Sequence, residues 1–213
     1  MTGVQTCALP ISLACALADE IQGEIISADS RQVYRGMDIG TGKDLSEYVV
    51  NGRSIPYHLI DIRDAGEKYN LYEYQHDFHE AFNAVCNRGH LPIICGGSGL
   101  YIEAVLKGFR LFDVPPNPEL RRQLQHHSLE ELTRLLRSYK ELHNTTDVDS
   151  VQRAIRAIEI AEYTSRMPAD RQEFESLNSL IVGIEVDRDT RRQRISNQLP
   201  RSEERRVGKE CRS

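Results

Sequence analysis

The sequence lacks several features that would place it in a special class of protein. Its 213 residues include no tryptophan and no apolar run near the roughly 20 residues that a membrane-spanning helix needs. Its five cysteines are odd in number and form no CxxC pair, which argues against a disulfide framework and a zinc site. The net charge of -5 gives the whole chain no attraction to nucleic acid or membrane surfaces. We therefore expect a globular protein of a reducing cytoplasm, with no membrane contact, whose contacts with RNA are local.

The two ends do not continue the patterns that they adjoin. Residues 1–12 begin with MTGVQTCALPI, and residues 201–213 read RSEERRVGKECRS. Both stretches can be written as translated sequencing-adapter DNA, with a shared GGAAGAGC core read on opposite strands. The alternative is a natural flexible head and a charged, solvated tail. We interpret residues 1–12 and 201–213 as an artefactual head and tail, and expect truncation at both ends.

Strand and helix patterns alternate before residue 113, which predicts a parallel α/β layer. The Ala/Leu-rich stretch Leu13 to Ile21 predicts the last turns of a helix, with Gly23 as its stop signal. The predicted strands are Glu24 to Ala28, Tyr57 to Ile62 and Leu91 to Cys95. The last of these is continuously apolar, as is typical of a strand buried on both faces.

Two further helices belong to this layer. Apolar residues recur at spacings of three and four on one face of the first, which ends at Gly89; they are Leu71, Tyr74, Phe78, Phe82 and Val85. The glycine-rich turn after Cys95 leads into the second, Leu100 to Lys107.

Three prolines in four positions, at 115, 116 and 118, mark the start of a helical insertion. Its predicted helices are Glu119 to Gln125, Leu129 to Tyr139 and Val151 to Tyr163. A strand at Leu180 to Val186 and a basic helix at Arg188 to Gln198 then return to the layer. The predicted organisation is thus an α/β core over residues 13–112 and 179–200, with a helical insertion at 113–178.

The segment Ser27 to Gln32, SADSRQ, places Asp29 at the C-terminal end of a strand. Open α/β sheets form their ligand crevice at such ends. The alternative is a capping role, because Asp and Ser side chains accept hydrogen bonds from the amides of a following turn. The spacing leaves both interpretations open.

Two glycine-rich segments resemble phosphate-binding loops. The run Cys95 to Tyr101, CGGSGLY, suits an anion at a helix N-terminus, but a tight turn explains its glycines equally well. The run Ile39 to Asp44, IGTGKD, mimics the end of a Walker A loop, but Met37 stands where that motif needs glycine and Asp44 where it needs Ser or Thr. We interpret the second run as a loop that leaves Lys43 as a candidate RNA contact.

The helix predicted at Val151 carries a polar edge. Gln152 and Arg156 are four residues apart, with Arg153 adjacent, and such an edge suits phosphates or a base. The alternative is an exposed helix in which Arg156 pairs with Glu159 or Glu162.

Four segments in order resemble the tRNA dimethylallyltransferase family. They are GEIISADSRQVYRGMDIGTGKD, HLIDIRD, LPIICGGSGLYIEAVLKG and DVDSVQRAIRAIEI. The resemblance covers nearly all of residues 13–200. It implies a P-loop α/β core with a helical insertion, and the transfer of a dimethylallyl group from dimethylallyl diphosphate to the exocyclic amine of the adenosine 3′ of the anticodon.

The resemblance also assigns residues and partners. Asp29 matches the family's general base, and two stretches match its tRNA contacts, Asp29-Ser30-Arg31-Gln32 and Gln152-Arg153-Ala154-Ile155-Arg156. Ser98 stands where the family usually has Thr, and Arg121 aligns with a further tRNA contact. The expected partners are tRNA and dimethylallyl diphosphate, the expected cofactor of the intact protein is Mg²⁺, and the expected state is a monomer.

One departure from the family concerns its P-loop, GxTxxGKT, which precedes the LACALA helix and holds diphosphate and Mg²⁺. We interpret that first strand and P-loop as missing here, and we expect no cofactor-binding or metal-binding residue in the 213 residues. We expect this chain to be inactive and poorly stable, since charge stabilisation of the leaving group is usually the largest catalytic contribution. The competing hypotheses are a P-loop nucleotide kinase-like phosphotransferase and a non-catalytic RNA-binding module.

Overall fold

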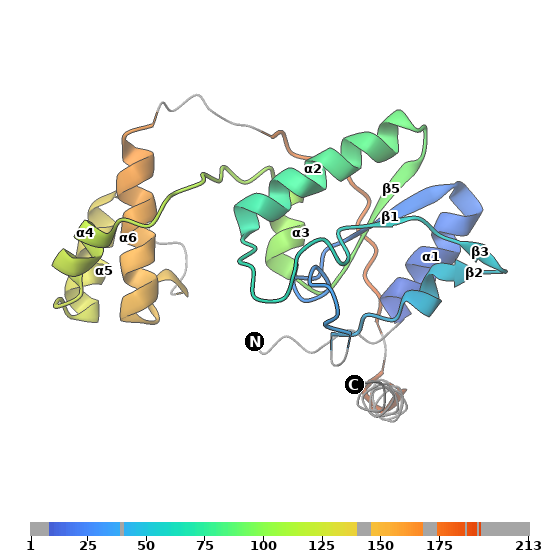
Figure 1. Ribbon diagram of the computed structural model, residues 1–213, viewed down its shortest axis with the longest axis horizontal. Coiled ribbons are helices and arrows are strands. Elements are labelled where there is room, and N and C mark those ends of the chain that lie inside the picture. Colours follow the sequence, from blue (N-terminus) through green and yellow to red (C-terminus); the bar gives the residue numbers. More distant parts are fainter. Residues whose placement is uncertain are drawn as a thin grey trace. The chain divides into compact units, whose positions relative to one another are not determined.

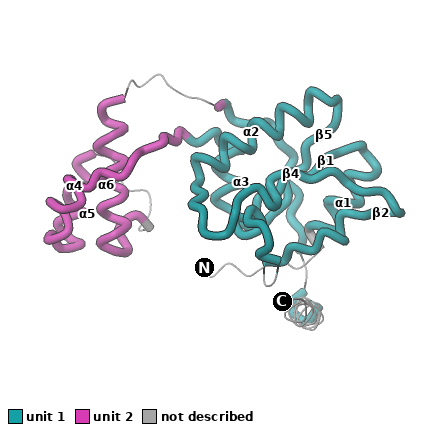
Figure 2. The backbone as a smooth tube through the Cα atoms, in the orientation of Figure 1, with its two compact units in different colours: residues 1–109, 175–213 teal, residues 110–174 magenta. Residues whose placement is uncertain are grey.

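The chain forms two compact units. The computed structural model describes residues 9–38, 41–139, 146–167, 174–185, 187–190 and 192 (Figure 1). Unit 1 comprises Met1–Phe109 and Glu175–Ser213, and unit 2 comprises Arg110–Phe174 (Figure 2). No helix among the described residues is long and apolar enough to cross a bilayer.

Unit 1 is built on a three-stranded parallel sheet in the order β4-β1-β5, which confirms the predicted α/β class. Its strands are β1 (Gly23–Ser27), β4 (Tyr57–His58) and β5 (Leu91–Cys95). All five residues of the central strand β1 are buried, as expected for a strand with a neighbour on each side.

Helices cover both faces of this sheet (Figure 1). Ile25 packs on one face with residues of α1 (Leu9–Ile21). Ile26 packs on the other with α2 (Leu71–Asn87) and α3 (Gly99–Leu106). Successive strand residues point to opposite faces, so one β-branched run supplies both cores.

The helix α2 confirms its predicted apolar face. Tyr74, Phe78 and Val85 are fully buried. Asn70 caps the helix and Glu73 completes a capping box, which satisfies two free backbone amides. Gln75 is also buried, and its amide donates to the carbonyls of Ala104 and Phe109 at 3.1 and 2.9 Å.

Three details in unit 1 differ from the sequence prediction. The helix α1 ends at Ile21 as predicted, but Gln22, and not Gly23, takes the left-handed conformation that follows it, with a φ of 54°. Gly23 is instead the first residue of β1, where a Cβ would lie 2.9 Å from a methyl of Ile93. β4 has only two residues instead of the predicted 57–62, since Leu59 and Asp61 adopt φ values of 62° and 57° that leave the strand conformation.

The prediction of a strand at Leu180 to Val186 is wrong over its described residues, 180–185, which form no strand. Leu180 is 91% exposed and Ile181 76%. An apolar run becomes a strand only where a neighbour satisfies its backbone groups, and none of the described strands pairs with this one. Residue 186 and most of the predicted helix at 188–198 lie outside the described residues.

The prediction that β5 is buried on both faces holds only in part: Ile93 and Ile94 pack against the cores on the two faces, but β5 is an edge strand of the described sheet and none of its residues is fully buried. Leu91 is 54% exposed, and the other four residues of the strand are half-buried.

A short segment between β1 and β4 was not predicted. It contains a 3₁₀ turn at Leu45–Tyr48 and a hairpin of β2 (Val49–Val50) and β3 (Arg53–Ser54). Tyr48 and Ile55 from this segment join the core beneath α1.

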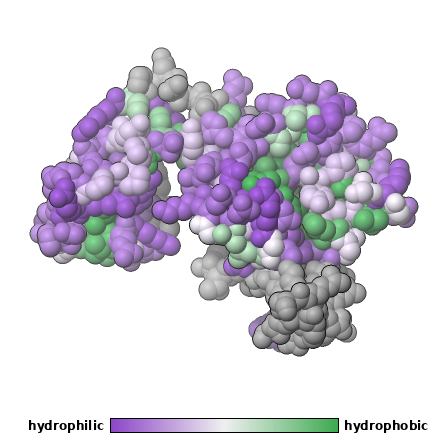
Figure 3. All heavy atoms as spheres, viewed as in Figure 1, coloured by the Kyte–Doolittle hydropathy of each residue, from purple (hydrophilic) through white to green (hydrophobic). Residues whose placement is uncertain are grey.

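Unit 2 is helical. Its helices are α4 (Pro118–Leu124), α5 (Leu129–Tyr139) and α6 (Val151–Ser165), with a 3₁₀ turn at Thr146–Val148. Asn117 and Ser150 cap α4 and α6 through their side-chain oxygens. Leu124, Leu132, Leu136 and Ile158 form the centre of the apolar core. In the view of Figure 3, the surfaces are mainly hydrophilic, with apolar side chains in separate groups.

A buried carboxylate fixes the N-terminal end of β1. Glu24 is 2% exposed and accepts two hydrogen bonds from Arg88, at 2.8 and 2.7 Å. His58 Nε2 and His90 Nδ1 each lie 2.6 Å from a Glu24 oxygen. The hydrogen bonds from Arg88, followed by those with the histidines, outweigh the opposing effect of burial and lower the pKa of Glu24 to about 2.

We expect Glu24→Gln to lower the free energy of unfolding at neutral pH by about 1–3 kcal/mol, because it weakens a buried charge-assisted network. The folded-state pKa lies below the ordinary value of 4.5, so the stabilisation is complete above that value and is lost as the pH falls toward 2. The difference between wild type and variant should therefore shrink over that window. Denaturant titrations over the pH range measure it, with the exposed Glu20→Gln as control; a difference independent of pH would contradict the assignment.

Candidate active site

The C-terminal ends of β1 and β5 meet and bring two of the sequence motifs together. The amide of Ala28 donates to the carbonyl of Cys95, and the amide of Ser98 donates back to the carbonyl of Ala28, both at 2.9 Å. The amide of Ser30 then donates to Ser98 Oγ at 2.9 Å, and the two serine hydroxyls lie 3.2 Å apart. SADS and GGSG thus lie side by side, joined by hydrogen bonds, and together make up the candidate site.

This meeting depends on a glycine. A Cβ on Gly96 would lie 2.3 Å from both the carbonyl carbon and the oxygen of Ala28. Backbone atoms cannot move out of the way as a side chain can, so only glycine fits this position. A tight turn therefore explains Gly96, as the sequence alternative allowed.

Asp29 lies just beyond the C-terminal end of β1 and is 8% exposed. Its Oδ1 accepts from the amide of Arg31 at 2.9 Å, and the amide of Gln32 donates to the Asp29 carbonyl at 3.2 Å. One carboxylate oxygen therefore caps the turn, as Asp commonly does. Among the described residues no donor reaches the other oxygen, Oδ2, which can therefore accept a proton.

The neighbours of Asp29 divide into exposed and buried residues. Ser30 and Arg31 are exposed. Gln32 is 3% exposed: its Oε1 accepts from Ser27 Oγ at 3.3 Å, and its Nε2 lies 3.5 Å from the carbonyl of Gly42. The Gln32 side chain therefore supports the turn from inside.

Tyr101 belongs to the site but was not predicted. Its ring stacks on that of Tyr74, with centroids 3.9 Å apart, and Tyr74 donates to the carbonyl of Ser27 at 3.4 Å. Burial, together with the charges of nearby groups that include Asp29, raises the pKa of Tyr101 to about 12. The aromatic residue two places after Gly99 in CGGSGLY was the available signal.

The expectation that Lys43 faces RNA is wrong. Its side chain is 2% exposed, and Nζ donates to Asp61 Oδ1 at 2.5 Å. Asp44 accepts from the amide and hydroxyl of Ser46, so its carboxylate caps the next turn. Residues 39 and 40 of this motif lie outside the described residues. Of the described ones, Lys43 and Asp44 are engaged in these contacts, and neither side chain is placed to bind a diphosphate or Mg²⁺.

In unit 2, two of the predicted RNA contacts share one buried carboxylate. Glu159 is 2% exposed and accepts from Arg121 at 2.7 and 2.8 Å, from Arg156 at 3.0 Å and from the amide of Asn117 at 2.8 Å. Burial alone would raise the pKa of Glu159, but these hydrogen bonds outweigh it and lower the pKa to about 2. The alternative that Arg156 pairs with Glu159 is therefore what the structure shows, although both arginines remain partly exposed.

The rest of the predicted stretch on α6 separates by face. Gln152 and Arg153 are exposed, and Arg153 pairs with Asp149. Ala154 and Ile155 are buried in the core of unit 2, so their side chains offer no surface to an RNA. The predicted site residues thus fall into two groups, one in unit 1 and one in unit 2.

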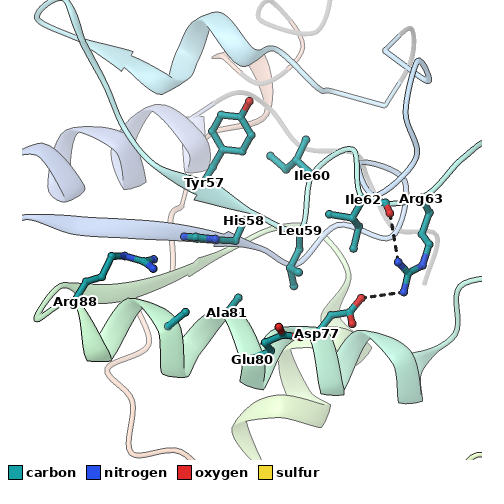
Figure 4. Close-up of a pocket in the computed structure, with 11 residues that line it drawn as sticks. Tyr57, His58, Leu59, Ile60, Ile62, Arg63, Asp77, Glu80, Ala81 and Arg88 are labelled. Carbon is teal, nitrogen blue, oxygen red and sulfur yellow. Dashed lines mark hydrogen bonds and ion pairs between the residues drawn. The ribbon is translucent and has the colours of Figure 1, made fainter.

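A pocket of about 530 Å³ lies elsewhere in unit 1, between β4 with the residues that follow it and one side of α2 (Figure 4). Arg63 donates to Asp77 at 3.2 Å at its rim. None of the predicted site residues lines this pocket.

Comparison with known proteins identifies the family. The model of the family described as IPP transferase matches residues 32–211. The chain belongs to the IPP transferase family. The resemblance drawn from the four motifs is therefore confirmed.

Individual proteins similar to this chain support the same assignment to the IPP transferase family. A tRNA dimethylallyltransferase of Porphyromonas gingivalis is 64% identical over 88% of this chain and 62% of its own length. One of Bacteroides fragilis is 61% identical over 87% and 61%. The crystal structure of a tRNA isopentenylpyrophosphate transferase from Bacillus halodurans superposes with a TM-score of 0.59 at 29% identity, over 95% of this chain and 64% of that one. This likeness supports the P-loop-type fold, and the chain spans about three fifths of the curated relatives.

We expect Gly96→Ala to destabilise the protein by about 1–3 kcal/mol or more, because the added methyl overlaps the backbone of Ala28. Gly99→Ala is the matched control, since a Cβ there meets nothing within 4 Å. Thermal unfolding of both variants measures the effect. Equal stability of the two would show that β1 and β5 do not approach this closely.

Proposed function

We propose that the chain serves in the transfer of a dimethylallyl group from dimethylallyl diphosphate to the exocyclic amine of the adenosine 3′ of the anticodon in tRNA. The observation that carries this proposal is the carboxylate of Asp29, held at the joined ends of β1 and β5 in a member of the IPP transferase family. Relatives named tRNA dimethylallyltransferase, at 61–64% identity, support it.

In this reaction Asp29 acts as the general base. The adenine nitrogen forms a bond to the allylic carbon as the bond from that carbon to diphosphate oxygen breaks, and diphosphate leaves with the electron pair. The amine nitrogen gives up a proton, for which Asp29 Oδ2 is the acceptor. An aromatic exocyclic amine is a weak nucleophile, so a base positioned beside it lowers the barrier.

The adenosine must leave its stack to reach such a carboxylate, which requires groups that hold the displaced nucleotide and its neighbours. In unit 1, Ser30, Arg31 and Ser98 surround Asp29 and have polar groups suited to this. In unit 2, Gln152 and Arg153 are exposed on α6, with Arg121 and Arg156 beside Glu159. Phosphate contacts by these arginines would position the RNA.

The diphosphate and its Mg²⁺ need groups other than those of IGTGKD, because Lys43 and Asp44 are engaged with Asp61 and Ser46. The P-loop that the resemblance implies would supply the charge that the leaving group needs. We therefore propose that the 213 residues do not complete the transfer unaided. No observation on the described residues favours the kinase alternative, and a module that only binds RNA would not need Asp29.

The test joins this chain to the P-loop segment and the C-terminal part of the 64% identical Porphyromonas gingivalis relative. The chimera should transfer labelled dimethylallyl groups to tRNA, whereas the 213-residue chain alone should not. Asp29→Asn in the chimera should reduce the transfer rate by about 10²–10⁴-fold, the usual contribution of a general base. Transfer by the unmodified chain would contradict the need for a P-loop, and an unchanged rate in Asp29→Asn would contradict the assigned base.

We expect Arg153→Ala to weaken binding of an anticodon stem-loop RNA and to lower the slope of log affinity against log salt by about one, as for the loss of one phosphate contact. Arg166→Ala is the control, because Arg166 is an exposed arginine of the same unit with a similar pairing, to Glu162. Fluorescence anisotropy titrations at several salt concentrations measure both. Equal effects of the two variants would mean that general charge, and not this edge of α6, attracts the RNA.

A further inference from the structure

We propose that Lys43 is a positioning residue for the Asp29–Gln32 turn, so that the turn's geometry depends on a buried ammonium group. This inference deepens the proposed function, on which it rests. Lys43 does not touch the reacting atoms, and its effect passes through Asp61 and Gln32.

The ammonium group of Lys43 lies in a cup of oxygen atoms. Nζ donates to Asp61 Oδ1 at 2.5 Å, to the carbonyl of Tyr34 at 2.7 Å and to Asp38 Oδ1 at 3.3 Å. An ammonium group has three hydrogens, so it can donate to all three of these oxygens at once. The side chain is 2% exposed, so the cup excludes most water and each contact is correspondingly strong.

The cup is tied to the turn by the backbone of Asp61. Asp61 adopts a φ of 57°, a conformation that costs energy for any residue except glycine. In that conformation its amide donates to the carbonyl of Gln32 at 3.0 Å. The carboxylate of Asp61 and its amide therefore link Lys43 directly to the last residue of the turn.

A second set of contacts joins the same two segments. The amides of Ile62 and Arg63 each donate to the carbonyl of Val33 at 2.9 Å, and the amide of Arg35 donates to the carbonyl of Arg63 at 2.8 Å. Tyr34, whose carbonyl Lys43 holds, lies in the middle of this ladder. Lys43 thus contacts both segments that these hydrogen bonds join, one at the carbonyl of Tyr34 and the other at the carboxylate of Asp61.

The opposite side of the turn is held by Ser98 and Gly96, through Ser30 and Ala28. Asp29 lies between the two anchors, and its Oδ1 is already engaged by the amide of Arg31. Loss of Lys43 would leave two carboxylates near each other and the Tyr34 carbonyl without its donor. Asp38 and Asp61 both contact Nζ, so their charges would repel once the ammonium group is lost, and the segment that carries Asp61 would lose its contact with Lys43.

The test compares amide hydrogen exchange in the 213-residue chain for wild type, Lys43→Met and Glu24→Gln. Glu24→Gln is the matched control, because it weakens a buried ion network at the other end of β1. In Lys43→Met the amides of Gln32, Arg35, Asp61 and Ile62 should exchange at least about tenfold faster than in the control, relative to the α2 amides of each variant. Uniform acceleration across unit 1 would mean that Lys43 only stabilises the fold and would overturn the proposal.

Asp61→Asn keeps the proposal testable if Lys43→Met does not fold. It preserves the volume and an acceptor oxygen while removing the charge, so it should accelerate the same amides. The double variant Lys43→Met/Asp61→Asn should be less disturbed than the sum of the single variants, because no repulsion between Asp61 and Asp38 remains. Additive effects would show that Lys43 does not act through Asp61.

Binding of an anticodon stem-loop RNA supplies the functional measurement. At matched folded fraction, Lys43→Met should bind it more weakly than Glu24→Gln, and adding Asp61→Asn should restore part of the loss. Faster exchange with unchanged RNA affinity would overturn the positioning role. If wild type binds no such RNA, the proposed function loses its support, while the exchange pattern still decides whether Lys43 holds the turn.

Discussion

The close approach of the ends of β1 and β5 is the constraint on which the site depends. Two reciprocal backbone hydrogen bonds between Ala28 and the Cys95–Ser98 turn hold the strand ends together, and only a glycine at position 96 permits them. The contact between the two motifs depends on these hydrogen bonds, because they place Ser98 within hydrogen-bonding distance of Ser30. The parallel sheet therefore does more than support the loops. It brings SADS and GGSG close enough for Ser30 and Ser98 to form a hydrogen bond.

Buried charges then fix what apolar packing leaves undetermined. Glu24 ties the N-terminal end of β1 to Arg88 and to His58 and His90, and Lys43 ties together the loops that follow β1 and β4. In unit 2, the buried carboxylate of Glu159 likewise ties α6 to α4 through Arg121, and it also accepts from Arg156. Apolar contacts are non-directional, whereas a charge that loses its partner in a low-dielectric interior is costly, so each network selects one arrangement of its loops.

The sequence predicts what depends on local pattern and misses what depends on distant partners. The spacing of Tyr74, Phe78 and Val85 is a property of one helix, and it was predicted correctly. The run Leu180 to Val186 has strand composition, but a strand also requires a neighbouring edge, which its composition cannot reveal. β4 ends early for a related reason, since the left-handed conformations of Leu59 and Asp61 are maintained by contacts that the run YHLIDI does not encode locally.

The site shows the same division. Motif spacing placed Asp29 after the end of a strand but left a capping role open, and Ser98 was singled out only by the resemblance to the family. The spacing could not show that Gln32 is buried or that Lys43 faces Asp61, 18 residues away. Polar residues in a loop are assumed to face solvent unless a partner is known, and the partner Asp61 lies in the loop after another strand, β4.

The pairing of charges also bears on how a chain of net charge -5 would meet RNA. Glu159 neutralises part of the charge of Arg121 and Arg156, so these arginines add little long-range attraction. What the carboxylate gives in return is orientation, because a guanidinium held through one edge keeps its remaining N–H groups in a fixed plane. In the proposed complex with RNA, discrimination would depend on whether phosphates fit these fixed donors. In that complex, the acidic balance of the chain would work against non-specific association, and the oriented arginines would favour an RNA whose backbone has the matching shape.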